Sequence, residues 1–278
     1  MTGIIVKNIS NDYTVNCNGT YYICKPRGKL RLNSQVPLVG DIVTIDEKNN
    51  YILEIKKRKN ELIRPSVSNV DLAVIVTSVK EPNFDSNLLD KQLTIISYNN
   101  IIPVIYFTKL DLLDDNELKE INKIISYYKE IGYLVSTTPL DLLNLIQNKI
   151  VVLTGQSGAG KSTLLNKIDT TLELKTDEIS YALGRGKHTT RHTELFETHN
   201  TFIVDTPGFS KLDFHNMSNI DIRDNMKEMF DNLHHCKYSD CMHIKEDGCH
   251  VKYLVENNEI LESRYNNYKS FINRWYYD

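Results

Sequence analysis

Long apolar runs are missing from this sequence: no stretch approaches the roughly 18 residues that a helix needs to span a bilayer. The first residues, MTGIIVKNIS, contain no apolar segment of the kind that directs secretion. Internal repeats, low-complexity tracts and an assembly stripe are also absent. With 278 residues, of which 41% are apolar and 25% charged, the chain is expected to be a globular, cytoplasmic monomer of two or three domains without membrane contact.

Cysteine is scarce, with five residues in all, but three of the five lie within 14 residues. Cys236, Cys241 and Cys249 fall in the pattern C-x4-C-x-H-x5-C with His243. In a chain without a secretion signal this pattern indicates a metal site rather than disulfides. Three thiolates and one imidazole suit a closed, structural Zn²⁺ site, which would stabilise a module too small for a large core. Neighbouring imidazoles that compete with His243 as ligand are His234, His235 and His250.

The first 66 residues contain 11 Lys and Arg against 6 Asp and Glu, a net charge of +5, whereas the rest of the chain carries −8. Short β-type runs, among them TYYICKPRGKLR at residues 20–31, alternate with turns at Asn18-Gly19 and Asn49-Asn50, and no helical period is present. We therefore predict a five-stranded barrel of the OB type. Its basic and aromatic side chains suggest an RNA partner. They are Tyr21, Tyr22, Lys25, Arg27, Lys29 and Arg31.

Buried strands and amphipathic helices alternate after Arg64-Pro65. Runs such as VDLAVIVTSV, IIPVIYFT and KIVVLTG are separated by helical segments, of which one begins at Asp85 and another near Asp114. This alternation predicts a parallel sheet covered on both faces. TELFET and TFIVDT, around His199-Asn200, predict a strand pair. We divide the chain into residues 1–66 (OB-fold RNA-binding barrel), 67–211 (parallel-sheet domain) and 212–278 (helical zinc-binding module).

GQSGAGKS, residues 155–162, matches the phosphate-binding pattern GxxxxGK[ST] between a predicted strand and a predicted helix. Its glycines allow backbone amides to surround phosphate oxygens at the helix N-terminus. Lys161 is expected to contact the β- and γ-phosphates, and Ser162 to bind Mg²⁺. The complete set of expected nucleotide contacts here is Gly155, Gln156, Ser157, Gly158, Ala159, Gly160, Lys161, Ser162 and Thr163.

DTPG, residues 205–208, follows the strand TFIV, 43 residues after Ser162. In this position Asp205 is expected to hold Mg²⁺ and the amide of Gly208 to approach the γ-phosphate. The intervening YALGRGKHTTRHTELF is rich in small polar residues, so we expect a loop that becomes ordered around nucleotide. A hydroxyl of Thr189 or Thr190 would complete the magnesium shell. Spacing does not choose between them, and we take Thr190 as the ligand.

TKLD, residues 108–111, ends a buried strand and has the Lys-x-Asp arrangement that recognises guanine. The carboxylate of Asp111 can accept hydrogen bonds from N1–H and the exocyclic amine of guanine, which adenine does not present. Lys109 is expected to pack along the base and Thr108 to steady the loop. Ser136 and Thr137, which end the next strand, are expected to contact the base as well. The combination favours GTP over ATP.

The base loop therefore precedes the phosphate loop by 44 residues, counted from Asp111 to Gly155. A parallel sheet needs its strands only in the right spatial positions, so joining the former termini and opening the chain elsewhere can preserve the site. We interpret the chain as a circularly permuted GTPase.

The residue that commonly positions the attacking water is also missing. Many GTPases have Gln directly after the DxxG segment, but here that position is Phe209. A neutral imidazole can orient water near pH 7, and His188, beside Thr189 and Thr190, is the candidate.

These motifs together resemble the RsgA/YjeQ family of small-subunit-dependent GTPases over essentially the whole chain. The resemblance is carried by KPRGKLR, TKLD, GQSGAGKS, GRGKHTT, DTPGF and the terminal Cys/His pattern. It implies an OB-like barrel, a permuted GTPase domain and a zinc module, with His243 as the fourth zinc ligand and His188 as the catalytic group. It also implies binding to the 30S subunit and its rRNA, and a role in late subunit maturation.

Two other hypotheses remain open from the residues. The chain could be a P-loop ATPase or kinase in which TKLD is accidental, which comparison of GTP and ATP affinity would reveal. It could instead be a zinc-stabilised RNA-binding module with a vestigial nucleotide site. The intact Lys161, Ser162 and Asp205 argue against the latter.

Overall fold

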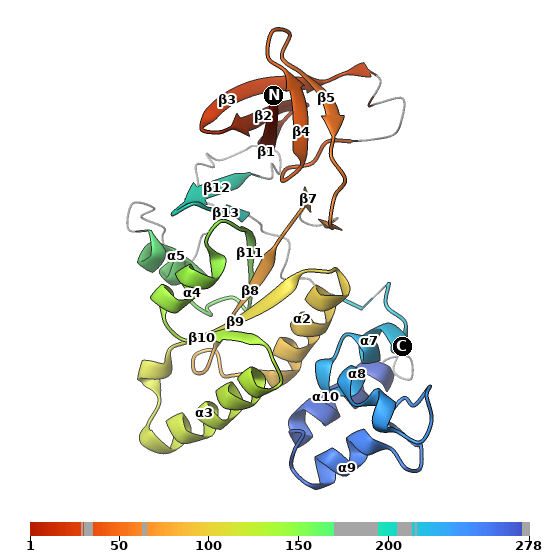
Figure 1. The fold of residues 1–278 in the computed structure, drawn as a ribbon. Helices are drawn as coiled ribbons and strands as arrows, with labels where there is room; N and C mark the ends of the chain where they lie inside the picture. Colours follow the sequence, from red (N-terminus) through yellow and green to blue (C-terminus); the bar gives the residue numbers. More distant parts are fainter. Residues whose placement is uncertain are drawn as a thin grey trace.

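The computed structural model describes residues 1–28, 30, 36–62, 66–169, 194–204, 213–214 and 216–273. Along the chain it forms a barrel, a sheet with helices on both faces, and a helical C-terminal module (Figure 1). In these residues no helix is both long and apolar enough to cross a bilayer. The fold class predicted from the sequence is confirmed.

Five strands close the N-terminal barrel in the order β1-β2-β3-β5-β4. They are β1 (Thr2–Ile9), β2 (Asp12–Cys17), β3 (Thr20–Pro26), β4 (Ile42–Asp46) and β5 (Tyr51–Ile55). Alternation places side chains such as Val15, Val43 and Ile52 in the barrel core, where none is exposed. Asn18 and Gly19 both have positive φ, 53° and 87°, which gives the two-residue turn predicted between β2 and β3.

The extended run expected from Thr20 to Arg31 ends earlier than the sequence suggested. Strand β3 stops at Pro26, and Gly28 and Leu30 are helical. The amide of Leu30 bonds back to the carbonyl oxygen of Arg27 at 2.9 Å, so the chain turns there instead of continuing along β5.

A six-stranded sheet forms the centre of the molecule, in the order β10-β9-β8-β11-β13-β12. The strands are β8 (Leu72–Ser78), β9 (Ile102–Thr108), β10 (Leu134–Ser136), β11 (Ile150–Thr154), β12 (Leu195–Thr198) and β13 (Thr201–Val204). Neighbours are parallel except β12 and β13, which form the predicted antiparallel pair. A short two-stranded sheet, β6 (Glu61–Leu62) with β7 (Val67–Ser68), connects the barrel to β8.

Alternation along β8 explains why helices cover both faces of the sheet. Leu72, Val74 and Val76 face one apolar cluster, while Ala73 and Ile75 belong to the other. Helices α4 (Pro139–Ile146) and α5 (Lys161–Ile168) pack on the first face, and α2 (Ser86–Tyr98) and α3 (Asp115–Glu130) pack on the second. Asp85 and Asp114 cap the N-termini of α2 and α3, as their positions in the sequence predicted.

The C-terminal module consists of short helices around its own apolar core. They are α7 (Asn219–Asp224), α8 (Lys227–Asp231), η2 (Leu233–His235), α9 (His250–Glu256) and α10 (Glu262–Ile272). The core includes Met226, Met229, Tyr268 and Phe271, and it extends to Ile95 of α2. The aromatic residues near the end of the chain, where described, therefore serve packing.

A buried ion cluster fixes this module against α2. The guanidinium of Arg264, which has no exposed surface, lies 2.5 Å from a carboxylate oxygen of Asp90 on α2 and 2.5 Å from one of Glu228 on α8. Tyr128 and Tyr127 of α3 donate their hydroxyls to Asp90 and Glu228 at 2.5 and 2.7 Å. Every member of the cluster is thus paired, which is the condition for tolerating buried charge.

Candidate functional site

A phosphate loop, residues 155–162, connects β11 to the start of α5. Gly155, Gly158 and Gly160 have φ of +134°, +77° and +94°. At Gly155 a Cβ would lie 2.1 Å from the carbonyl oxygen of Val76, so only glycine lets the loop leave the sheet this close to β8. Residues 156–158 are exposed and Ala159 is buried. A glycine loop between a strand and a helix N-terminus is an arrangement in which backbone amides bind phosphate.

Lys161 and Ser162 lie in the first turn of α5. The Nζ atom of Lys161 donates hydrogen bonds to the carbonyl oxygens of Gly155 and Gln156, both at 2.8 Å, so the amine lies over the loop. Burial lowers the pKa of Lys161. A charge held away from bulk water attracts a phosphate more strongly than an exposed one. Ser162 is only 5% exposed, at the point where the helix begins.

The base loop, residues 108–111, begins at the end of β9. Lys109 has a left-handed backbone, with φ of 62°, and Asp111 is exposed within the short helix η1 (Leu110–Leu112). The amine of Lys109 donates to the carbonyl oxygen of Glu81. This contact holds the lysine side chain in place and leaves the carboxylate of Asp111 open to solvent, as recognition of a base requires.

Thr108 joins the base loop to the phosphate loop. Its Oγ1 atom donates to the carbonyl oxygen of Ala159 at 2.7 Å. Its side chain also lies next to Gly160, since a Cβ placed on that glycine would be 3.8–3.9 Å from Thr108 atoms. The two loops are separated in the sequence, but they meet because β9 and β11 flank β8 in the sheet. The structure therefore brings the predicted base and phosphate regions together.

Ser136 and Thr137 lie at the end of β10. Ser136 pairs in register with Tyr106 of β9, two residues before Thr108, so both strand ends reach the same edge of the sheet. The hydroxyl of Ser136 donates to the carbonyl oxygen of Thr138 at 2.9 Å. Thr138 in turn caps α4. Ser136 thereby fixes the turn, and Thr137 is half-buried beside it.

Part of the predicted site lies outside the described residues. These positions are His188, Thr189, Thr190, Asp205 and Gly208. The described segment 194–204 ends at Val204 of β13, the residue before Asp205, and Val204 pairs with Val152 of β11. The strand that leads to Asp205 is therefore the neighbour of the strand that leads to the phosphate loop.

The turn at residues 79–85 also contributes to the site, and the sequence analysis missed it. Besides the bond from Lys109 to Glu81, the amine of Lys80 lies 2.8 Å from a carboxylate oxygen of Glu117, the residue that completes the capping box of α3. The ring of Pro82 lies 3.7 Å from where a Cβ on Gly158 would be. Pro82-Asn83 marks a turn in the sequence, but nothing there shows its role in the site, because its contacts are made across the sheet edge.

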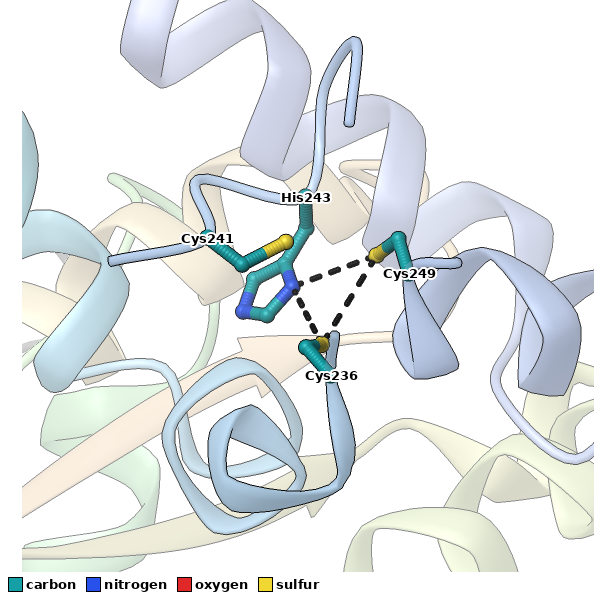
Figure 2. Close-up of side chains that lie close together, drawn as sticks. All are labelled: Cys236, Cys241, His243 and Cys249. Atoms are coloured by element: carbon teal, nitrogen blue, oxygen red, sulfur yellow. Dashed lines mark hydrogen bonds between the residues drawn. The ribbon is translucent and has the colours of Figure 1, made fainter. Parts of the chain in front are cut away.

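Cys236, Cys241, His243 and Cys249 form a compact cluster in the C-terminal module, whose ligand atoms all lie within 4.8 Å of one another (Figure 2). Nδ1 of His243 is 3.5 Å from Sγ of Cys236 and 3.3 Å from Sγ of Cys249. Burial, together with the neighbouring thiols of Cys249 and Cys236, raises the pKa of Cys241 to about 12. Three crowded thiols and one imidazole are a donor set that fits a tetrahedral divalent cation.

The orientation of His243 suits a ligand role. Its Nε2 atom lies 3.0 Å from the carbonyl oxygen of Met229, an acceptor that holds the proton on Nε2 and leaves Nδ1 free to bind a metal. The competing histidines do not join the four-residue cluster. His234 and His235 are exposed and His250 is half-buried, and the ring of His235 lies at a tilt against the rings of His234 and His250.

Comparison with protein families gives two matches. The RsgA GTPase family matches residues 55–215, and the RsgA N-terminal domain matches residues 2–52. Among curated proteins, the "Small ribosomal subunit biogenesis GTPase RsgA" of Enterococcus faecalis is 45% identical over 98% of this chain and 94% of its own length. The "Small ribosomal subunit biogenesis GTPase RsgA 2" of Oceanobacillus iheyensis is 44% identical over 97% and 96%.

Solved structures give the same picture. The chain is similar to "YloQ, a circularly permuted GTPase", with a TM-score of 0.84 and 36% identity over 98% of this chain and 94% of that one. It is also similar to YjeQ from Thermotoga maritima, with a TM-score of 0.86 and 33% identity over 100% and 99%.

Proposed function

This chain belongs to the RsgA GTPase family, and on that premise we propose that it hydrolyses GTP to GDP and phosphate on the small (30S) ribosomal subunit, late in the maturation of that subunit. It is a circularly permuted GTPase of ribosome biogenesis. Contact of the barrel with rRNA is supported by the net charge of +5 in residues 1–66. We also propose that the 30S subunit stimulates hydrolysis. We propose that it acts as a cytoplasmic monomer, divided into residues 1–66, 67–211 and 212–278.

The hydrogen bond from Thr108 to the carbonyl oxygen of Ala159 carries the assignment to GTP. It couples the loop that bears Asp111 to the loop that bears Lys161, so a single nucleotide can span both. Asp111 would accept hydrogen bonds from guanine, with Lys109 along the base and Thr137 beside it.

Hydrolysis needs positioning and charge neutralisation more than covalent chemistry. We propose that the amides of residues 155–160 and the amine of Lys161 hold the β- and γ-phosphates, and that Gly208 approaches the γ-phosphate. Ser162, Thr190 and Asp205 would hold Mg²⁺, which when bound neutralises phosphate charge. His188 would accept a hydrogen bond from the attacking water. The small subunit would raise turnover by holding His188 in that position.

Turnover measured with and without purified 30S particles tests this function. We expect 30S particles to raise GTP hydrolysis, and His188→Ala to remove most of that increase, by about 100-fold or more, because general base catalysis contributes roughly 10²–10⁴-fold. Binding of a GTP analogue should stay normal. His199→Asn is the matched control, since His199 lies in the exposed turn between β12 and β13 and Asn tolerates its φ of 44°. Full stimulation of His188→Ala would exclude this histidine.

We propose that the four-residue cluster binds one structural Zn²⁺. Loss of a residue that only hydrogen-bonds to a metal ligand lowers metal affinity by roughly 10–100-fold. Cys249→Ser removes a ligand itself, so the zinc affinity should fall by more than that. Cys241 and Cys249 belong to the apolar core of the module, and Cys249 directly precedes α9, so amide hydrogen exchange should rise first in α9 and α10. Zinc content and exchange are the measurements. Cys17→Ser, at a buried cysteine of the barrel, is the control and should retain one equivalent of zinc. Equal zinc content in both variants would refute the assignment.

A further inference from the structure

Two carboxylates at the outer edge of the sheet contact the barrel: Glu194, directly before β12, and Glu197 within β12. Glu194 pairs with Lys7 of β1 in an isolated antiparallel bridge, and its carboxylate oxygens lie 2.8 and 2.9 Å from Nζ of Lys7. Glu197 accepts hydrogen bonds from Nδ2 of Asn16 and the hydroxyl of Tyr21, both at 3.4 Å. We call Lys7, Asn16 and Tyr21 the donor row.

The donor row runs across three consecutive strands of the barrel. Lys7 belongs to β1, Asn16 to β2 and Tyr21 to β3, and Asn16 pairs in register with Tyr21. The side chain of Lys7 is 34% exposed, and Tyr21 is 56% exposed. Between the row and β12 lies a groove of about 240 Å³, lined on one side by Val6 and Thr14. A cation, polar donors and an open aromatic ring on one barrel face are the groups that bind a nucleic acid strand.

The charges on the two sides of this contact are opposite. Residues 1–66 carry a net charge of +5 and the rest of the chain −8, and Glu194 and Glu197 present part of that negative charge to the basic barrel. A carboxylate accepts the same hydrogen bonds as a phosphate oxygen. The amine of Lys7 cannot bind the carboxylate of Glu194 and a phosphate of RNA equally well at the same time. Binding of the donor row to β12 and its binding to a phosphate backbone therefore compete.

We propose that β12, together with Glu194 directly before it, is an internal competitor for RNA: the carboxylates of Glu194 and Glu197 occupy the donor row in the free protein, and the phosphate backbone of RNA displaces them. The inference rests on the proposed RNA partner and deepens it. Glu194 lies four residues after Thr190, so displacement of β12 acts on the chain next to the segment to which we assign catalysis. Binding of RNA to the barrel and the state of the nucleotide site are then linked, and each must influence the other.

The double variant Glu194→Gln/Glu197→Gln tests the competition, because glutamine keeps the shape and removes the charge. The probe is a fluorescent single-stranded RNA of about 16 nucleotides, the upper site size of such a barrel, followed by anisotropy at fixed salt. Release of two partly exposed contacts should tighten binding roughly 3- to 10-fold. The difference in RNA affinity between the GTP-analogue and GDP states should also shrink.

The matched control is Glu120→Gln/Glu130→Gln, which removes the same charge from exposed positions on α3, away from the barrel (Figure 1). An equal gain in the control, or no gain in the β12 variant, overturns the proposal. A second test combines Glu194→Gln with Lys7→Gln. The gain from Glu194→Gln should disappear when Lys7 is absent, whereas additive effects would contradict a shared contact.

The test of this competition can fail while the proposed function stands. Stimulation of the parental protein by 30S particles tests the function without any β12 variant. A parental protein that is stimulated and binds RNA as tightly as Glu194→Gln/Glu197→Gln refutes only the competition. A parental protein that binds neither RNA nor 30S particles refutes both.

Discussion

Asp111→Asn should lower the affinity for GTP by about 100-fold or more, while the affinity for xanthosine triphosphate rises. The carboxylate of Asp111 is exposed at the end of the base loop and would accept two hydrogen bonds from guanine, each worth roughly 1.5–3 kcal/mol because the acceptor is charged. An asparagine amide turns one acceptor into a donor. That donor opposes the exocyclic amine of guanine but matches the carbonyl group that xanthine has at the same position. Competition with a fluorescent nucleotide measures both affinities.

Asp115→Asn is the control for this experiment. It makes the same chemical change four residues away, at an exposed position in the first turn of α3. Both variants should remain folded, since neither carboxylate is buried. Unchanged GTP affinity in Asp111→Asn would remove the base loop from the nucleotide site and revive the hypothesis of an ATPase or kinase.

Arg264→Ala should reduce the free energy of unfolding by about 3–5 kcal/mol. The guanidinium is completely buried between Asp90 and Glu228, and its removal leaves two carboxylates without a cation in a site closed to water. Urea unfolding, followed by circular dichroism and by tyrosine fluorescence, measures the loss. Lys123→Ala is the contrasting control, because Lys123 forms an exposed ion pair with Glu120 and should cost no more than about 1 kcal/mol.

The pH dependence of the Arg264→Ala deficit supplies an independent check. Burial raises the pKa of Asp90 even beside Arg264, whose attraction opposes that rise. Without the guanidinium the pKa in the folded state must rise further above its unfolded value. A group shifted upward in this way stabilises the fold when protonated, and it loses that contribution as pH rises through the folded pKa. The deficit should therefore be smaller near pH 5 than at pH 7. A constant deficit would mean that packing, not charge, explains the effect.

The barrel, the sheet and the helix caps could be predicted because each depends on local patterns. Alternation in β8, the turn at Asn18-Gly19 and the capping Asp114 are visible in a few consecutive residues. Strand β3 was predicted too long because the stop signals Pro26 and Gly28 stand within a run of basic and apolar residues that resembles a single strand. The turn that ends it is closed by the bond from Leu30 to Arg27. Patterns of residues identify element types better than element ends.

The candidate site was predictable where a motif carries its own geometry, and not elsewhere. The phosphate and base loops follow from GQSGAGKS and TKLD, and the structure adds the bond from Thr108 to Ala159 that joins them. Arg264 could not have been found from the sequence, since its partners lie 36 and 174 residues away on helices of ordinary polar composition. The choice of His243 needed the family resemblance, and the structure supplies the physical reason in the acceptor at Met229.

The strand order has a consequence for how the protein is made. Strand β8 is the first strand of the sheet to be translated, β9 and β10 then add on one side of it, and β11 and the β12–β13 pair add on the other. No later strand has to insert between two that have already paired. The sheet can grow outward while the polypeptide leaves the ribosome, and the half that carries the base loop is complete before the half that carries the phosphate loop has been synthesised.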